Sequence, residues 1–120
     1  NHPASKYTEP SIVKIKDIAK YYNRVVKFAV LIDKVKIIKT KEQKDMAFID
    51  ASDETGKMSF ILFAILFNTI DEYKKNVVVI IKGRVVKRID KYQVNITNRY
   101  WNFSRLLVKY EVYYIKIKKY

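Results

Sequence analysis

The stretch Val25–Lys39, "VVKFAVLIDKVKIIK", decides the fold of this chain. Its first half is apolar at every second residue, at Val26, Phe28, Val30 and Ile32. Beyond Asp33 the apolar residues have the opposite parity, at Val35 and Ile37. Since a strand points successive side chains to opposite faces, one continuous inward face requires an extra residue near Asp33–Lys34, which is a β-bulge. A bulged, bent first strand is typical of a small barrel.

The rest of the chain is also rich in strand patterns. Alternation and turn signals predict further strands at residues 46–53, 57–63, 77–89 and 92–97. The turn "DETG" joins the first two of these, and Gly56 is expected to supply a positive φ there. Residues 64–75 have helical spacing and predict a short helix. Residues 11–23 fit either a strand or a short helix.

The resulting order, β-β-β-α-β-β, predicts a mainly β fold. It is the order of the OB-fold, a five-stranded Greek-key barrel with a helix between strands three and four. An SH3-like barrel would lack that helix, and a ferredoxin-like fold would need two longer ones. We expect the barrel domain at residues 11–105, after a short lead-in at 1–10 that is a linker or a cut end. Residues 106–120 are expected to be a helix or strand extension, or the start of another domain.

Charge is the strongest compositional signal. The chain has 25 Lys and Arg against 12 Asp and Glu, a formal net charge of +13. Such an excess favours binding to a polyanion, either nucleic acid or an anionic membrane, although a lysine-rich surface also serves solubility. The chain has no cysteine, which favours a cytoplasmic location, and no apolar run approaches the roughly 20 residues of a membrane span. We expect no cofactor and a monomeric domain.

Phe48 is the first candidate for contact with nucleic acid. Its neighbours Ala47, Ile49 and Ala51 form an inward face, which places Phe48 outside, beside Met46 and Asp50. OB-folds bind single strands across strands two and three, where aromatic side chains stack on bases. The alternative is that Phe48 packs beneath a terminal segment. Ile61 and Phe63 are expected on the same outer face.

Basic residues near two loops are the second set of candidates. The loop between strands one and two carries Lys39, Lys41 and Lys44, with Lys36 just before it, and the turn between strands four and five is flanked by Arg84, Arg88 and Lys91. These loops commonly clasp oligonucleotides in OB-folds, and lysine or arginine there would neutralise phosphates. The alternative is a solvated surface. We expect neither a catalytic group nor a metal site at Asp50, Asp53 and Glu54, because no His or Cys accompanies them, and we expect Asp53 and Glu54 to build the turn.

The run "VKFAVLIDKVKIIKTKEQKDMAFIDASDETGKMSFILF" (residues 26–63) resembles a known family. Its Thr40–Lys41, its Met46–Ala47–Phe48 and its Asp53–Gly56 turn, with "VVVIIKGRV" at residues 77–85, resemble the OB-fold domain of the bacterial DNA polymerase III alpha subunit. The resemblance covers about residues 11–105. The chain differs in having Val30 where that family often has Gly, Ala64 where it has Pro, and no Gly in the loop at residues 39–45.

The resemblance implies a function. It implies a non-catalytic module of a DNA-directed DNA polymerase, a nucleotidyltransferase of DNA replication, that contacts the single-stranded template near the polymerase. Two alternatives stay open. The domain could dock to other polymerase domains or replisome subunits, or it could bind RNA, because the Phe-Ile-Asp strand and turn are also similar to the anticodon-binding barrel of class II aminoacyl-tRNA synthetases.

Overall fold

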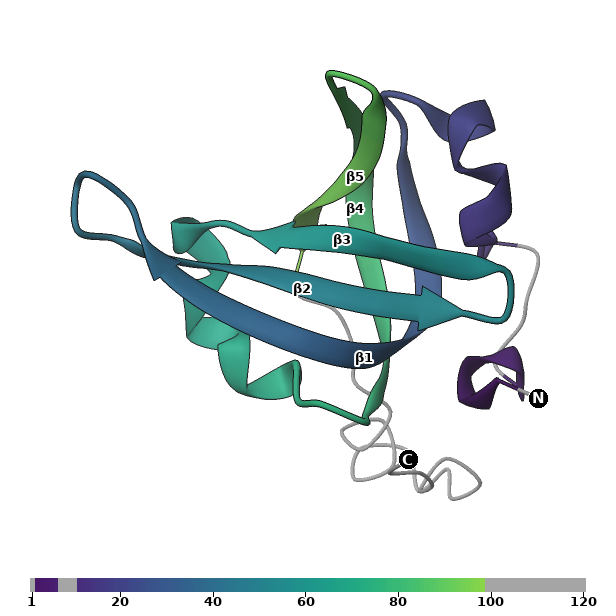
Figure 1. Cartoon of the computed structure of the whole chain (residues 1–120), viewed down its shortest axis with the longest axis horizontal. Coiled ribbons are helices and arrows are strands. Elements are labelled where there is room, and N and C mark those ends of the chain that lie inside the picture. The colour runs from purple at the N-terminus through teal and green to yellow at the C-terminus, as the bar shows by residue number, and fades with distance from the viewer. Residues whose placement is uncertain (1, 7–10, 99–120) are drawn as a thin grey trace.

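The described part of the chain folds into a closed five-stranded barrel (Figure 1). A computed structural model describes residues 2–6 and 11–98. The strands follow one another around the barrel in the order β1-β2-β3-β5-β4, which confirms the mainly β OB-fold prediction. Their bounds are β1 (Val25–Lys39), β2 (Asp45–Asp53), β3 (Gly56–Leu62), β4 (Val78–Arg88) and β5 (Lys91–Asn98).

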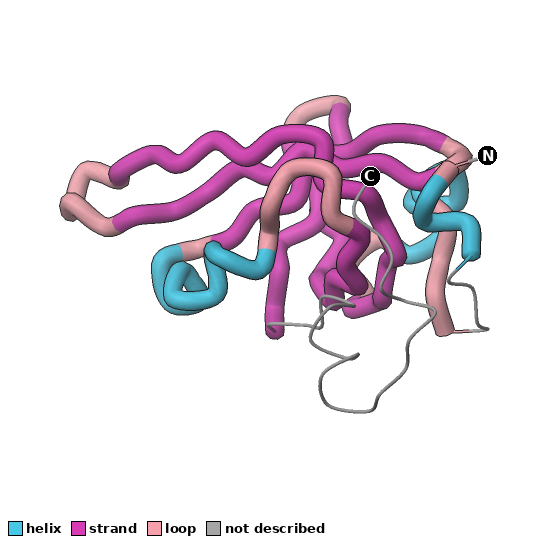
Figure 2. The backbone as a smooth tube through the Cα atoms, turned by 90° about the horizontal axis from the view of Figure 1, so that it is seen from below, coloured by secondary structure: helices cyan, strands magenta, loops and turns pink. Residues whose placement is uncertain are grey.

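The predicted bulge in β1 is confirmed at Asp33. The first half of β1 pairs with β4 and the second half with β2, and the register with β2 shifts between Ile32 and Lys34. Ile32 is fully buried and Val35 packs against the core, so the bulge keeps both halves facing inward. Ile37 was expected on the same inner face, but its side chain is 54% exposed. Its partner Ala47 pairs on its other side with Leu62, the last residue of β3, so Ile37 lies at the end of the barrel. Beyond this point β1 and β2 continue as a two-stranded ribbon (Figures 1 and 2).

The core consists of the inward-facing residues of all five strands. Phe28 of β1 and Phe60 of β3 meet edge to face, with ring centroids 5.4 Å apart. Such aromatic pairs add to the hydrophobic stabilisation that burial of the rings supplies. Ala47, Ile49 and Ala51 of β2 are fully buried, as their alternation predicts.

Short 3-10 helices close the barrel. The helix η2 (Ile15–Tyr21) resolves the ambiguity of residues 11–23, with Ile15 buried and Ile18 packed against the core. The helix η3 (Ala64–Glu72) lies between β3 and β4, where a helix was predicted. Its Leu66 and Ile70 pack against the core. The described residues contain no helix long and apolar enough to cross a membrane.

The N-terminal helix η1 (Pro3–Lys6) is attached to β2 through a histidine. The ring of His2 accepts the Ala4 N–H at Nδ1, 2.9 Å away, so its Nε2 is the atom that donates to Ser52 Oγ at 2.9 Å. Burial lowers the pKa of His2, which favours the neutral ring that this arrangement requires. The predicted extension at residues 106–120 lies outside the described residues.

A close approach between β4 and β5 explains the glycine in β4. A Cβ built at Gly83 would lie 2.5 Å from Val94 Cγ1 and 2.6 Å from the backbone oxygen of Asn95. The register between the two strands also shifts between Lys82 and Gly83. Gly56 is different, because it has no positive φ, contrary to the prediction, and its added Cβ would meet only Ile15 Cγ2 at 3.4 Å.

This contrast predicts the outcome of two glycine substitutions. Gly83→Ala should lower the free energy of unfolding by about 3 kcal/mol, because the methyl group meets backbone that cannot rotate away. Gly56→Ala is the matched control and should change it by less than about 1 kcal/mol. Urea titrations of the two variants provide the measurement. Equal stability of the two would contradict the packing described for Gly83.

Candidate nucleic-acid interface

The outer face of β1, β2, β3 and β5 carries the aromatic candidate. Strand pairing aligns Lys36, Phe48, Ile61 and Asn95 in one row across these four strands. Since the flanking residues Ala47 and Ile49 are fully buried, Phe48 points outward, as expected, and its side chain is partly exposed. The centre of this outer face is therefore an aromatic ring with a lysine on the adjacent strand.

Ile61 and Phe63 behave differently from one another. Both follow the outward parity of β3, but Ile61 is only 2% exposed, so the expectation of an exposed Ile61 is wrong. Its register partners are Phe48 on β2 and Asn95 on β5, and side chains of neighbouring strands can cover an outward-facing residue. Phe63, which follows the last residue of β3, is 41% exposed. We therefore leave Ile61 out of the surface that a ligand can touch and keep Phe63 at its border.

The loop between β1 and β2 presents lysines at the tip of the projecting ribbon (Figure 2). Thr40 organises its turn, accepting the N–H groups of Gln43 and Lys44. The loop has no glycine, and Gln43 adopts the left-handed conformation that glycine favours, with a φ of 64°. Lys41 and Lys44 are exposed, whereas Lys39 Nζ lies 2.9 Å from Asp45 Oδ1 and is engaged in an ion pair.

The basic residues near the turn between β4 and β5 divide into two groups. Arg84 donates a hydrogen bond to the backbone oxygen of Asn23 at 2.8 Å, so its guanidinium group contributes to the fold. Arg88 and Lys91 form the last residue pair before the turn and are exposed. Ile89 within the turn is 96% exposed and has a φ of 55°.

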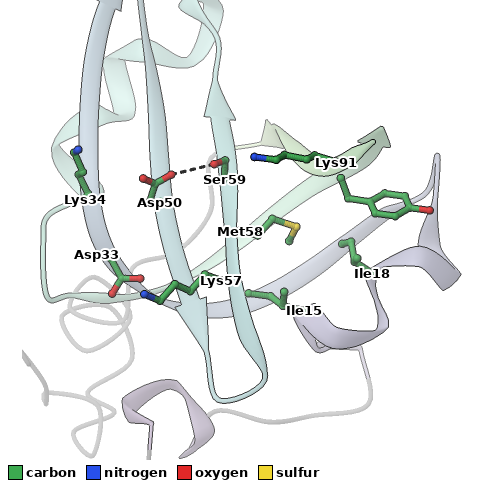
Figure 3. Close-up of a pocket in the computed structure, with 10 residues that line it drawn as sticks. Ile15, Ile18, Asp33, Lys34, Asp50, Lys57, Met58, Ser59 and Lys91 are labelled. Atoms are coloured by element: carbon green, nitrogen blue, oxygen red, sulfur yellow. Dashed lines mark hydrogen bonds between the residues drawn. The ribbon is translucent and has the colours of Figure 1, made fainter. Parts of the chain in front are cut away.

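A groove of about 670 Å³ begins beside this turn (Figure 3). It lies where β3 and β5 diverge, since their pairing is confined to Phe60–Val94 and Ile61–Asn95. Apolar side chains from η2 and β3 are among its lining residues. The polar side chains that line it are Asp33, Lys34, Asp50, Lys57, Ser59 and Lys91.

Sequence reasoning did not select most of the polar residues of this groove. Lys34, Lys57 and Ser59 were not candidates, although all three follow the outward parity of their strands. For Lys34 the parity shift at the bulge was the available signal. Met46, Phe48 and Lys36 lie on the same outer face, and Lys41 and Lys44 lie on the ribbon tip. Arg84 lies on β4, opposite Asn95 of β5 on one side and Val25 of β1 on the other.

The acidic turn between β2 and β3 is structural. The Asp53 side chain is 7% exposed and accepts hydrogen bonds from Thr55 and Gly56 at Oδ1 and from the Ile15 N–H at Oδ2. It therefore closes the turn and also fastens η2 to it. Glu54 is exposed and pairs with Lys14 at 3.0 Å, which lowers the pKa of Glu54. In residues 2–6 and 11–98 no three His, Cys, Asp or Glu side chains gather as a metal ion would require.

The fold agrees with the comparison to known families. The model of the OB-fold nucleic acid binding domain matches residues 26–100. The chain belongs to this family. It is also 32% identical over 98 residues to the DNA polymerase III subunit alpha of Bacillus subtilis (strain 168). That match covers 78% of this chain but only 9% of the relative, so the chain corresponds to a small part of such a polymerase subunit.

The role of Asp53 generates a stability prediction. Asp53→Ala should lower the free energy of unfolding by about 2–3 kcal/mol, because it leaves the Ile15 N–H and the turn N–H groups without their acceptor. Glu54→Ala, at the exposed neighbouring position, should leave the free energy of unfolding nearly unchanged, because water screens its ion pair with Lys14. Thermal unfolding followed by circular dichroism compares the two variants. A similar small loss in both would show that η2 does not depend on the carboxylate.

Proposed function

We propose that this domain binds single-stranded DNA across the outer face of β1, β2 and β3. The observation that carries the proposal is the position of Phe48, an outward aromatic in the middle of β2 with Lys36 opposite it on β1. Base stacking on an aromatic ring contributes about 1–3 kcal/mol per base and does not require a particular sequence. The family assignment supports a nucleic acid as the partner.

The lysines supply the second part of the proposal. Lys34 and Lys36 lie on the outer face of β1, and Lys41 and Lys44 lie on the ribbon that continues from it. A strand that stacks on Phe48 can pass its phosphates along this basic rim. Each phosphate neutralised by a lysine releases a counterion, so affinity should fall as salt concentration rises.

The setting of the domain is part of the same proposal. The similarity to the alpha subunit of DNA polymerase III supports a module of a replicative polymerase that contacts the template in the cytoplasm of a bacterium. The domain would itself be non-catalytic and would depend on the rest of such a subunit for polymerisation. Other polymerase domains would then be its neighbours.

A specific observation favours a second candidate function, docking to another protein. Three large apolar residues are exposed: Phe63 after β3 is 41% exposed, Ile65 on η3 is 88% exposed, and Ile37 near the end of β1 is 54% exposed. Exposed apolar side chains of this size are typical of protein contacts when they form a continuous patch. In this alternative Ile65 matters and Phe48 does not.

A titration with fluorescently labelled oligothymidylate tests the proposed function. The unaltered domain should bind at low salt, and Phe48→Ala should weaken binding by about 1–3 kcal/mol, the free energy of one stacked base. Lys41→Ala should reduce the salt dependence of the affinity as well as the affinity itself. Fluorescence anisotropy measures both.

Ile65→Ser serves as the control for this experiment. It alters an exposed apolar residue outside the proposed face and should leave DNA affinity unchanged. No binding at low salt, or equal affinity of the Phe48→Ala variant, would overturn the proposed function.

Tighter binding to RNA of the same sequence would favour the RNA-binding alternative, since the 2′-OH distinguishes the two. If the domain binds another protein in the presence of nuclease, and Ile65→Ser abolishes that binding, the result would support docking.

A further inference from the structure

An unusual carboxylate lies in the middle of the proposed DNA face. Asp50 is exposed and follows Phe48 by two residues on the outer side of β2, with Lys34 opposite on β1 and Ser59 opposite on β3 (Figure 3). A negative charge at this place repels phosphates. A chain with a net charge of +13 has no general need for it.

Asp50 also differs from the other acidic residues near the face. Asp45 and Glu54 are held in ion pairs by Lys39 and Lys14. Across the described residues, no lysine or arginine lies within ion-pair distance of Asp50, although Lys34 is its partner in the strand register. Its hydrogen-bond partner is Ser59, whose Oγ–H donates to Oδ1 at 3.0 Å. The carboxylate is therefore oriented by a neutral group, and its charge is left available.

An ionised carboxylate selects among bases because it only accepts hydrogen bonds. On the Watson–Crick edge, guanine alone offers two adjacent donors, the N1–H and the N2 amino group. Adenine and cytosine each offer an amino group next to an acceptor nitrogen, which a carboxylate repels. Each carboxylate oxygen has two lone pairs, so the bond from Ser59 does not prevent a bidentate contact.

The spacing on β2 suits such a contact. Residues two apart on a strand are separated by about 7 Å on the same face. A base that stacks on Phe48 therefore extends its edge toward Asp50, while Lys34 and Lys91, which line the same groove, are placed for the backbone phosphates. We propose that Asp50 makes this face prefer guanine at the position that stacks on Phe48. The inference rests on the proposed function and adds a base preference to it.

Oligothymidylates with one central substitution test the preference. A central dG should bind about five- to tenfold more tightly than a central dA or dC, the lower part of the range for a bidentate base contact. A central deoxyinosine, which lacks the N2 amino group, should lose most of this gain. Anisotropy titrations at one fixed salt concentration provide the affinities for the oligonucleotides with central dG, dA, dC and deoxyinosine.

Variants assign the preference to the carboxylate. Asp50→Asn should abolish the dG preference and bind plain oligothymidylate at least as tightly as before, because a charge that repels phosphate is removed. Ser59→Ala should reduce the preference, and Asp45→Asn, on the same strand but beside the ribbon loop, should keep it. Circular dichroism checks that these substitutions leave the fold intact.

The possible outcomes separate this inference from the proposed function. Binding of plain oligothymidylate with equal affinities for all central bases would overturn the guanine preference alone. A dG preference that survives Asp50→Asn would also overturn it. If no oligonucleotide binds at low salt, the proposed function falls and this inference falls with it.

Discussion

The extra residue in β1 is the constraint on which the barrel depends. Leu31 pairs with both Val78 of β4 and Ser52 of β2, so β1 leaves one neighbour and joins the other within a residue or two of Asp33. A slip of one residue there would exchange the two faces of the second half of β1. Val35 would turn to solvent, and Lys34 and Lys36 would turn toward the core. The same bulge therefore closes the barrel and sets the lysines on the face that carries Phe48.

Alternation along the strands was sufficient to predict most of the architecture. The succession of strands along the chain, the bulge and the direction of Phe48 all follow from which side chains are apolar, because a buried face tolerates little else. Ile61 was not predictable in this way, since its burial depends on neighbours across the sheet and not on its own strand. The direction of a side chain and its exposure are separate properties, and sequence parity reports only the first.

Turn geometry was the other property that sequence did not determine. The turn at Gly56 is closed by three hydrogen bonds to one oxygen of Asp53, so a positive φ is not needed there. The left-handed conformation occurs instead at Asn23, Gln43, Asn76 and Ile89. At Gln43 the hydrogen bonds around Thr40 hold the loop in place of glycine. Such local bonds depend on how the flanking strands meet, which the turn sequence alone does not contain.

The parallel contact between β3 and β5 has a consequence for motion. It comprises two residue pairs, whereas each other pair of neighbouring strands shares a longer antiparallel ladder. Local opening of a fold begins where the fewest backbone bonds must break, and ligand-binding regions tend to lie at this weakly held end of the stability scale. The groove lined by Ser59 and Lys91 opens beside this short contact. Fluctuations of the barrel should therefore be largest at the edge of the surface that faces its partner, and backbone amides there should exchange with solvent before those of the β1–β2 ladder.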